Sequence, residues 1–368
     1  MAHPDIQAVL DGDSDGCIVC GDCLEVMADW PAGCVDLVLT DPPYYKVKGH
    51  AWDRQWDDPA AFLAWLGRVA GQWHRLLKPN GSLYCFASPQ MAARVEVEIS
   101  KQFNVLNRIV WAKADGAGNG QWKKQNPDGW LRAFFPQTEY LIFAEHYGAD
   151  QAALGQAGYG AKCDELRGFV FEPLRAYLDG ERQRAGVSRA QCNGACGFAP
   201  TPGAMASRHY FSASQWCLPT REHYEALQGL FNSGTGGPYL RREYEDLRRE
   251  YEDLRRPFRV TAAVPYTDVW TFATVAAYPG KHPCQKPLAM MEHIIDVSTR
   301  PGALVLDSFC GVGTTCLAAK GRARRWIGIE QSADYAAGAR YRLAEAETGV
   351  PVAEARVGQI GLFEKGVS

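Results

Sequence analysis

The order of apolar and amphipathic segments is the feature of this sequence that most restricts its fold. Short apolar runs alternate with longer stretches whose apolar residues recur at helical spacing, which is typical of an α/β sheet with mostly parallel strands. The expected strands are residues 35–40, 82–86, 105–111, 138–144, 303–307 and 325–330. The expected helices are 60–77, 314–320 and a last long helix that Ser332 caps.

The middle of the chain interrupts this alternation, so we expect an insert of a different kind. A helix is expected over 171–184 and helical structure over 223–231, with a turn at 185–189 that contains Gly186 and the helix-capping Ser188. Two helices joined by such a turn suggest a helix-turn-helix-like unit, and a plain helical insert is the alternative. The expected division is 1–147, 148–258 and 259–368.

An exact seven-residue repeat lies in this insert, where 241–247 recur as 248–254. Tyr244, Leu247, Tyr251 and Leu254 share one helical face. Glu245 and Glu252 precede Arg249 and Arg256 by four residues, the favourable order for ion pairs. Two heptads are too short for an independent coiled coil, so we interpret the segment as a charged helix packed on its own domain. The alternatives are an arginine stripe that faces phosphates and a homodimer contact.

Charge and composition exclude several classes of protein. The net charge is −3, which excludes a histone-like DNA binder but not an enzyme with a local basic surface. The chain has no apolar run of the ~18 residues that a membrane helix needs and no secretory signal at Met1, so we expect a cytoplasmic protein without a membrane partner. Twelve cysteines then indicate reduced thiols.

Two cysteine patterns raise the question of a metal. The CxxCxxC run of Cys17, Cys20 and Cys23 has no second CxxC to complete an iron–sulfur set, and it alternates like a strand. A second group of cysteines and histidines could form a zinc site, but their spacings fit no compact zinc finger. That group is Cys163, Cys192, Cys196, His209, Cys217 and His223. We therefore expect no metal.

A glycine-rich turn indicates a nucleoside cofactor. The segment 309–314, Phe-Cys-Gly-Val-Gly-Thr, follows a strand that ends at Asp307 and opens a helix whose free N–H groups can face a ligand. Glu330 ends the next strand, about 20 residues on, where a carboxylate can bind ribose hydroxyls. The turn is not GxxxxGK[ST], which excludes a P-loop.

The segment Asp41-Pro42-Pro43-Tyr44 is the strongest signal of chemistry in the chain. The prolines stiffen the backbone, so that the Asp41 carboxylate and the Pro42 carbonyl can accept hydrogen bonds from one exocyclic amine. Tyr44 can stack on the ring that carries the amine. These groups suit the methylation of a planar amino group.

The two motifs together resemble the S-adenosylmethionine-dependent amino-methyltransferases of DNA, and their order in the chain resembles the β class. Segments 21–25, 77–82 and 281–287 are similar to further motifs of that family. The resemblance implies a Rossmann-like sheet with circularly permuted motif order and an inserted target-recognition region. The catalytic residues that it implies are Asp41, Pro42, Pro43 and Tyr44. The cofactor-binding residues that it implies are Asp22, Asp41, Lys286, Asp307, Phe309, Cys310, Gly311, Gly313, Thr314 and Glu330.

Related activities are weighed on the same residues. An Asp before Pro-Pro-Tyr resembles adenine-N6 enzymes, whereas Ser there resembles cytosine-N4 enzymes, which stay an alternative because both amines suit the same two acceptors. Cys284 lies in a Pro-Cys-Gln tripeptide similar to that of cytosine-C5 enzymes, but it precedes the glycine turn and no Glu-Asn-Val follows. Protein-glutamine methyltransferases differ in residue and motif order. A catalytically silent DNA-binding regulator on the same fold is the remaining alternative.

Double-stranded DNA is the substrate that the resemblance implies, with the target base flipped out of the helix. A basic and aromatic loop after Tyr44 and arginines of the middle region are the candidate contacts. They are Tyr45, Lys46, Lys48, Trp52, Arg54, Lys123, Lys124, Arg182, Arg184, Arg189 and Arg208. The sequence does not indicate the recognition site, the oligomeric state or a restriction endonuclease partner.

Overall fold

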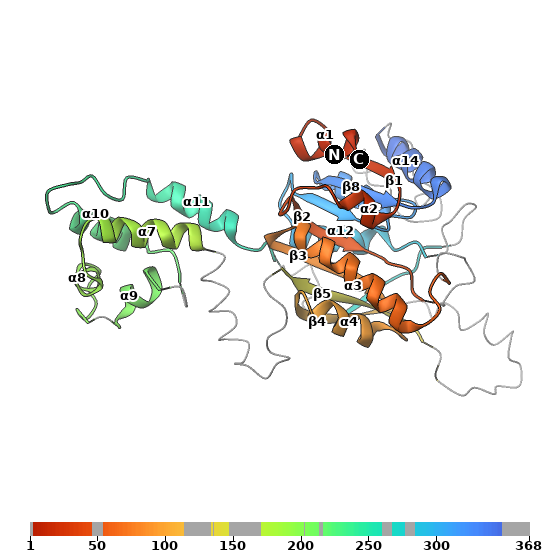
Figure 1. The fold of residues 1–368 in the computed structure, drawn as a ribbon, viewed down its shortest axis with the longest axis horizontal. Helices are drawn as coiled ribbons and strands as arrows, with labels where there is room; N and C mark the ends of the chain where they lie inside the picture. Colours follow the sequence, from red (N-terminus) through yellow and green to blue (C-terminus); the bar gives the residue numbers. More distant parts are fainter. Residues whose placement is uncertain are drawn as a thin grey trace, which may run out of the picture. The chain divides into compact units, whose positions relative to one another are not determined.

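The computed structural model describes residues 3–45, 54–113, 134, 136–146, 171–201, 203–212, 216–259, 267–276 and 284–347. The chain divides into two compact units (Figure 1). The first unit comprises Met1–Asp150 and Pro257–Ser368, and the second comprises Gln151–Arg256.

The first unit is built on one eight-stranded mixed sheet in the order β1-β8-β7-β2-β3-β5-β4-β6. Its strands are β1 (Gly16–Cys20), β2 (Val35–Thr40), β3 (Leu77–Ala87), β4 (Asn104–Lys113), β5 (Thr138–Glu145), β6 (Val269–Phe272), β7 (Leu304–Asp307) and β8 (Arg325–Glu330). Strand β5 runs antiparallel to both β3 and β4, and all other neighbours are parallel. The expected α/β class with a mostly parallel sheet is confirmed.

The strand order shows how the two ends of the chain combine. Strands β1 and β2 follow one another in sequence, yet β8 and β7 lie between them in the sheet. In the register, Leu37 faces Val305 across the β2–β7 pair, and Leu306 faces Ile327 across β7–β8. The permuted order expected from the motifs is therefore an arrangement of one continuous sheet.

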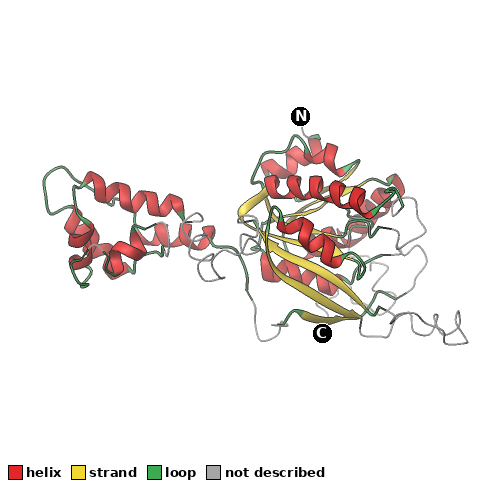
Figure 2. Ribbon diagram, turned by 60° about the horizontal axis from the view of Figure 1, so that its bottom comes forward, coloured by secondary structure: helices red, strands yellow, loops and turns green. Residues whose placement is uncertain are grey.

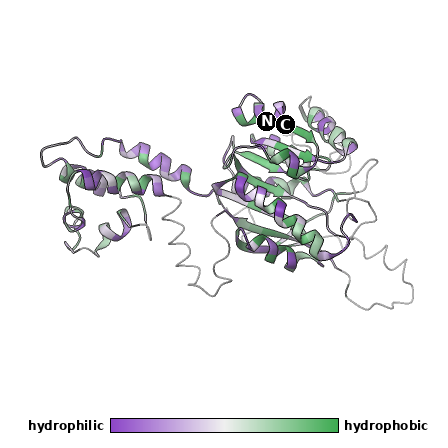
Figure 3. Cartoon of the chain, in the orientation of Figure 1, coloured by the Kyte–Doolittle hydropathy of each residue, from purple (hydrophilic) through white to green (hydrophobic). Residues whose placement is uncertain are grey.

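Helices cover both faces of this sheet (Figure 2). One apolar core holds residues of α1 (Pro4–Asp11), α2 (Cys23–Met27), α3 (Pro59–Leu76) and α4 (Ala92–Ser100). The other holds residues of α12 (Leu288–Ser298), α13 (Thr314–Gly321) and α14 (Ala333–Glu347). Successive strand residues alternate between the two cores, as Leu304 and Leu306 do against Val305, which gives the strands their continuous apolar character (Figure 3).

The second unit is helical over its described residues and has its own apolar core. Its helices are α7 (Glu172–Arg184), α8 (Arg189–Ala195), α9 (Met205–Tyr210), α10 (Arg221–Phe231) and α11 (Tyr244–Leu254). The expected turn between α7 and α8 is present, with Gly186 at φ 67° and a capping box between Ser188 and Gln191.

The repeat forms α11, and its tyrosine–leucine face packs within the second unit as predicted. Leu247 is fully buried, and the Tyr251 ring stacks on Phe171 with ring centroids 4.7 Å apart. The Glu245–Arg249 ion pair suggested by the spacing is replaced by two others, because Glu245 pairs with Arg221 of α10 and Arg249 pairs with Asp246. A nearby helix therefore competes for charges that the repeat alone would pair internally.

Several elements were not among the sequence expectations. They are α1, α2, α4, α9, α12 and β6. Strand β3 also begins at Leu77, directly after α3, five residues before the expected start at residue 82. Within the described residues, none of the helices has the length and apolar character that crossing a membrane would require.

Candidate active site

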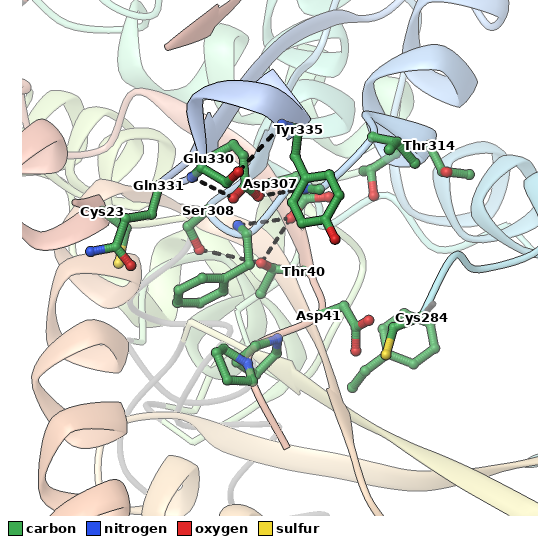
Figure 4. Close-up of a pocket in the computed structure, with 18 of the residues that line it drawn as sticks. Cys23, Thr40, Asp41, Cys284, Asp307, Ser308, Thr314, Glu330, Gln331 and Tyr335 are labelled. Carbon is green, nitrogen blue, oxygen red and sulfur yellow. Dashed lines mark hydrogen bonds between the residues drawn. The ribbon is translucent and has the colours of Figure 1, made fainter. Parts of the chain in front are cut away.

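A cavity of about 380 Å³ lies where four neighbouring parallel strands end. Asp41 after β2, Asp307 at the end of β7 and Glu330 at the end of β8 line it (Figure 4). Asp22, which follows β1, also lines it. Carboxyl ends of parallel strands are the usual position of ligand sites in such sheets, and ~300–1,000 Å³ is the usual volume. The cavity therefore has the place and size of a small-molecule site.

Asp41 is the half-buried carboxylate at the centre of this wall. Its Oδ2 accepts a hydrogen bond from Lys286 Nζ, while its Oδ1 is buried and has no hydrogen-bond partner among the described residues. Pro42 and Pro43 follow it along the cavity wall. Because an unpaired buried acceptor is costly, Asp41 Oδ1 is prepared to accept a hydrogen bond from a ligand.

Asp41 is one of four charged side chains that alternate in sign beside Tyr44. Lys286 lies between the carboxylates of Asp41 and Glu139, with Nζ 3.5 Å from Glu139 Oε2. Lys113 Nζ contacts the other oxygen of Glu139 at 2.7 Å. The Tyr44 hydroxyl donates to Glu139 Oε2 at 3.0 Å. Two ammonium groups thus balance two carboxylates, so the cluster has no net charge.

Burial and neighbouring charges oppose one another in this cluster. Burial raises the pKa of Asp41 and outweighs the opposite effect of Lys286. Burial alone would lower the pKa of Lys286, but the carboxylates of Asp41 and Glu139 reverse this, and the pKa is raised. Burial alone would raise the pKa of Glu139, but Lys286 and Lys113 lower it to about 2. Glu139 and Lys286 are therefore firmly charged.

The glycine turn lies beside Glu330. Gly311 adopts the left-handed φ of 51°, which glycine reaches without a Cβ clash, and its N–H donates to Glu330 Oε2 at 2.8 Å. Glu330 Oε1 accepts from the Ser332 N–H at 2.8 Å. Burial raises the pKa of Glu330, and these backbone N–H groups partly offset it. Each carboxylate oxygen keeps a second lone pair for a ligand hydroxyl.

A buried polar network supports the floor of the cavity. Thr40 Oγ1 donates to Asp307 Oδ1 at 2.9 Å, and the Phe309 N–H donates to the same oxygen at 3.2 Å. Trp73 Nε1 donates to Ser308 Oγ at 2.9 Å. Burial nevertheless raises the pKa of Asp307 to about 6. This network joins the ends of β2 and β7 to α3.

An aromatic wall closes one side. The Trp65 ring lies 5.5 Å from that of Phe309 and 4.7 Å from that of Trp56, measured between centroids. Trp65 and Phe309 both line the cavity. A planar aromatic ligand in the cavity could therefore stack on these side chains.

Most of the predicted site residues come together at this cavity. Those that line it are Asp22, Asp41, Pro42, Pro43, Tyr44, Lys286, Asp307, Phe309, Gly311, Thr314 and Glu330. Asp22 also caps α2, because its Oδ1 accepts the N–H groups of Leu24 and Glu25. Cys310 and Gly313 are not among the lining residues. Cys310 is buried in an apolar core, and a Cβ on Gly313 would approach the Ala339 Cβ of α14 to 3.1 Å.

Sequence reasoning missed several residues of the site. Glu139, Lys113, Trp65 and Trp73 belong to no motif, and Cys284 lines the cavity although it was not among the predicted site residues. The signal that could have indicated Glu139 is an acidic residue inside the apolar run 138–144. Trp65 and Trp73 carry no such signal, because tryptophans are ordinary on the apolar face of a helix.

The predicted DNA contacts divide into three groups. Lys46, Lys48, Trp52, Lys123 and Lys124 lie outside the described residues. Tyr45 packs its ring 5.8 Å from that of Phe62, and Arg54 is exposed. The remaining four are the arginines of the second unit, which differ in how far their side chains are used within it.

Among these arginines, Arg182 makes the most contacts within the second unit and Arg208 the fewest. Arg182 Nε donates to Asp179 at 2.7 Å, its NH1 donates to the Val187 carbonyl at 2.7 Å, and its guanidinium faces the Phe211 ring. Arg184 pairs with Glu181, and Arg189 donates to the Phe211 carbonyl at 3.2 Å. Arg208 is exposed and has no side-chain partner within the described residues.

Metal binding was weighed for the cysteines, and the described part of the chain holds no group of three or more His, Cys, Asp or Glu that could ligate an ion. His223 of the considered zinc set contacts the Tyr210 hydroxyl through Nδ1 at 2.6 Å. Cys163 lies outside the described residues.

Fold and cavity define a Rossmann-like protein whose Asp-Pro-Pro-Tyr segment and glycine turn share one site. The family model described as DNA methylase, of N6/N4 type, matches residues 35–340. The chain therefore belongs to this family of DNA methylases, and DNA is its substrate.

Relatives in this family are similar over different shares of the chain. DNA adenine methyltransferase YhdJ of Escherichia coli K12 is 25% identical over 323 residues, which are 86% of this chain and 79% of that protein. Type II methyltransferase M2.DpnII of Streptococcus pneumoniae is 48% identical over 85 residues, which are 22% of this chain and 32% of that protein. The solved PvuII DNA methyltransferase, cytosine-N4-specific, is 14% identical with a TM-score of 0.50, covering 89% of this chain and 86% of that one. At that identity the likeness concerns the fold alone.

Proposed function

We propose that this DNA methylase transfers a methyl group from S-adenosylmethionine to the N6 amine of adenine at specific sites in double-stranded DNA. The observation that carries the proposal is the buried Oδ1 of Asp41, which has no hydrogen-bond partner among the described residues and lies in the same cavity as the glycine turn and Glu330. Asp41 Oδ1 can thus accept a hydrogen bond from an amine in the same cavity whose glycine turn and Glu330 suit a nucleoside.

The residues of the cavity fit the proposed cofactor. Glu330 keeps a lone pair on each oxygen for ribose hydroxyls, and the left-handed Gly311 lets the backbone pass close to a ligand. Asp22, Asp307 and Lys286 supply the charged groups that a methionine moiety would meet. When bound, the cofactor supplies an electrophilic methyl group on a sulfonium centre.

The protein's part in the reaction is to hold and polarise the target amine. Asp41 Oδ1 and the Pro42 carbonyl would each accept one amine hydrogen, which turns the nitrogen lone pair toward the methyl group. As the nitrogen–methyl bond would form and the methyl–sulfur bond would break, positive charge would grow on that nitrogen, and the Asp41 carboxylate would stabilise it. The nitrogen would then release one proton to solvent. No covalent intermediate with the enzyme is needed, so positioning accounts for much of the acceleration.

Adenine is favoured over cytosine on two grounds. The Asp of Asp41-Pro42-Pro43-Tyr44 resembles adenine-N6 enzymes, and the relative from Escherichia coli K12 is named a DNA adenine methyltransferase. The base must leave the duplex to reach Asp41, which costs a few kcal/mol that aromatic stacking in the pocket offsets. Tyr44, Trp65 and Phe309 are the rings available for it.

The proposed target-recognition region is the insert 148–258, which contains the whole second unit, Gln151–Arg256. It carries twelve Arg and no Lys between 171 and 256, and arginine is the side chain best suited to bidentate contacts with guanine and phosphate. Grafting 148–258 from a relative with another target should change the methylated site. An unchanged site would move specificity to the loops at 45–57 or 115–129.

Tritiated methyl transfer to mixed DNA, followed by mass spectrometry of the digested product, tests the proposal. N6-methyladenine is the expected product, and the Asp41→Asn variant is the matched control because it keeps size and loses charge. N4-methylcytosine alone would refute the adenine assignment. DNA binding without any transfer would support the silent regulator instead.

A further inference from the structure

Glu139 is the acidic side chain that contacts the most members of the charged cluster. It receives the Tyr44 hydroxyl at 3.0 Å, lies 3.5 Å from Lys286 Nζ and pairs with Lys113 at 2.7 Å. Its own side chain is only 16% exposed. It does not line the cavity, so it can act there only through its neighbours.

Two of the three partners of Glu139, Lys286 and Tyr44, also lie beside Asp41. Lys286 donates to Asp41 Oδ2, and this leaves Oδ1 as the oxygen without a partner in the described chain. The Lys286 ammonium also lies over the Tyr44 ring, 5.1 Å from its centroid, and over the Phe86 ring at 4.7 Å. The position of one ammonium thus sets both the carboxylate and the ring.

Strand geometry explains how Glu139 reaches this position. Strand β5 is antiparallel to β3, with Tyr140 opposite Ala87, so the first residues of β5 lie beside the last residues of β3. The last residues of β4 lie beside the first residues of β5 as well, because Trp111 is opposite Glu139 and Lys113 follows it. Lys113 and Glu139 therefore meet beside the segment that leaves β2 at Asp41.

We propose that Glu139 is a positioning residue that, through Lys286 and Tyr44, keeps Asp41 Oδ1 open to the target amine. The inference rests on the proposed amine methylation at Asp41. Lys286 pairs with Glu139 as well as with Asp41, so its ammonium neutralises the Asp41 carboxylate less completely. That carboxylate must stabilise the positive charge that grows on the amine. Lys113 keeps Glu139 ionised for this role.

The Glu139→Gln variant tests the charge and preserves the shape, because an amide oxygen still accepts the Tyr44 hydrogen bond. We expect kcat to fall about 10- to 100-fold, the range for loss of a charged hydrogen-bond partner, with KM for DNA and Kd for S-adenosylmethionine changed less than about 3-fold. Glu145→Gln is the matched control at the other end of β5, where Glu145 accepts from Asn104, and it should leave kcat unchanged. Parallel losses in kcat and cofactor binding, or no loss in kcat, would overturn the proposal.

Lys113→Met separates this role from a general structural one. Its kcat should fall about 2- to 10-fold in the parent and hardly further in the Glu139→Gln background, because Lys113 acts through the charge of Glu139. Independent, multiplying losses in the double variant would contradict the assignment.

Thermal unfolding keeps the inference testable if the parent transfers no methyl group, a result that would refute the proposed function alone. Lys286→Met leaves two buried carboxylates facing one another in the parent but only one in the Glu139→Gln background. It should therefore lower the melting temperature more in the parent than in that background. Equal losses would show that Glu139 and Lys286 are uncoupled and would end the proposal.

Discussion

Asp41 and Lys286 are 245 residues apart in the chain, and their side chains form an ion pair in the cavity wall. The pair joins the segment that leaves β2 to the segment that precedes α12. Because only one oxygen of Asp41 is used in it, the pair orients the carboxylate without closing it to a ligand.

The Asp41→Ala variant should lose transfer while it keeps cofactor binding. The substitution removes an acceptor that holds and stabilises the amine, for which a loss on the order of 10²–10³-fold or more is expected. The cofactor is proposed to be held mainly around Gly311 and Glu330. Tritiated methyl transfer and equilibrium binding of S-adenosylmethionine measure the two effects, and near-normal turnover would contradict the role of Asp41.

Asp307 should make stability depend on pH. Burial raises its pKa from 3.8 to about 6, so between these values the folded state binds more protons than the unfolded state. The free energy of unfolding therefore decreases as pH rises from about 4 to 6, by ~3 kcal/mol in total for this group. Asp307→Asn keeps an acceptor for Thr40 and has no such titration. Urea unfolding from pH 4 to 7 should show the variant gaining on the parent, and a constant difference would contradict the prediction.

Gly313→Ala should destabilise the first unit. Gly313 has φ 77°, where a Cβ costs ~1–2 kcal/mol, and the new methyl group would lie 3.1 Å from the Ala339 Cβ. Gly338→Ala, on the helix α14 that Gly313 packs against, meets nothing within 4 Å and should stabilise by ~0.5–1 kcal/mol. Thermal unfolding of both variants compares them, and shifts of the same sign would be unexpected.

Arg182→Ala and Arg208→Ala should separate folding from DNA binding in the second unit. Arg182 loses an ion pair, a backbone contact and an aromatic neighbour, so we expect ~2–3 kcal/mol of destabilisation. Arg208→Ala should change stability by less than ~0.5 kcal/mol and, as a phosphate contact, lower the salt slope of DNA binding by about 1. Urea unfolding and anisotropy titrations at several salt concentrations measure these effects. Unchanged DNA affinity in Arg208→Ala would remove it from the interface.

The sequence predicts the elements that carry the two motifs well, and their neighbours less well. Strands β2 and β8 agree with the predicted bounds because each is a mostly apolar run that ends in a polar residue. Glu139 was missed because its partners depend on β5 lying between β3 and β4, and chain order does not determine sheet order. Cys310 and Gly313 are part of the glycine-rich motif in the sequence. Their small size is explained instead by packing, Cys310 in an apolar core and Gly313 against α14.

The position of β7 and β8 between β1 and β2 has a consequence for the synthesis of the protein. A ribosome completes β1 and β2 early, but the two strands that separate them emerge only after residue 304. Until then the growing chain has neither Asp307 nor Glu330, and two strand edges stay open to wrong partners. The nascent chain therefore cannot form the cavity, and any product that stops before β7 lacks two of the four strand ends that form its wall.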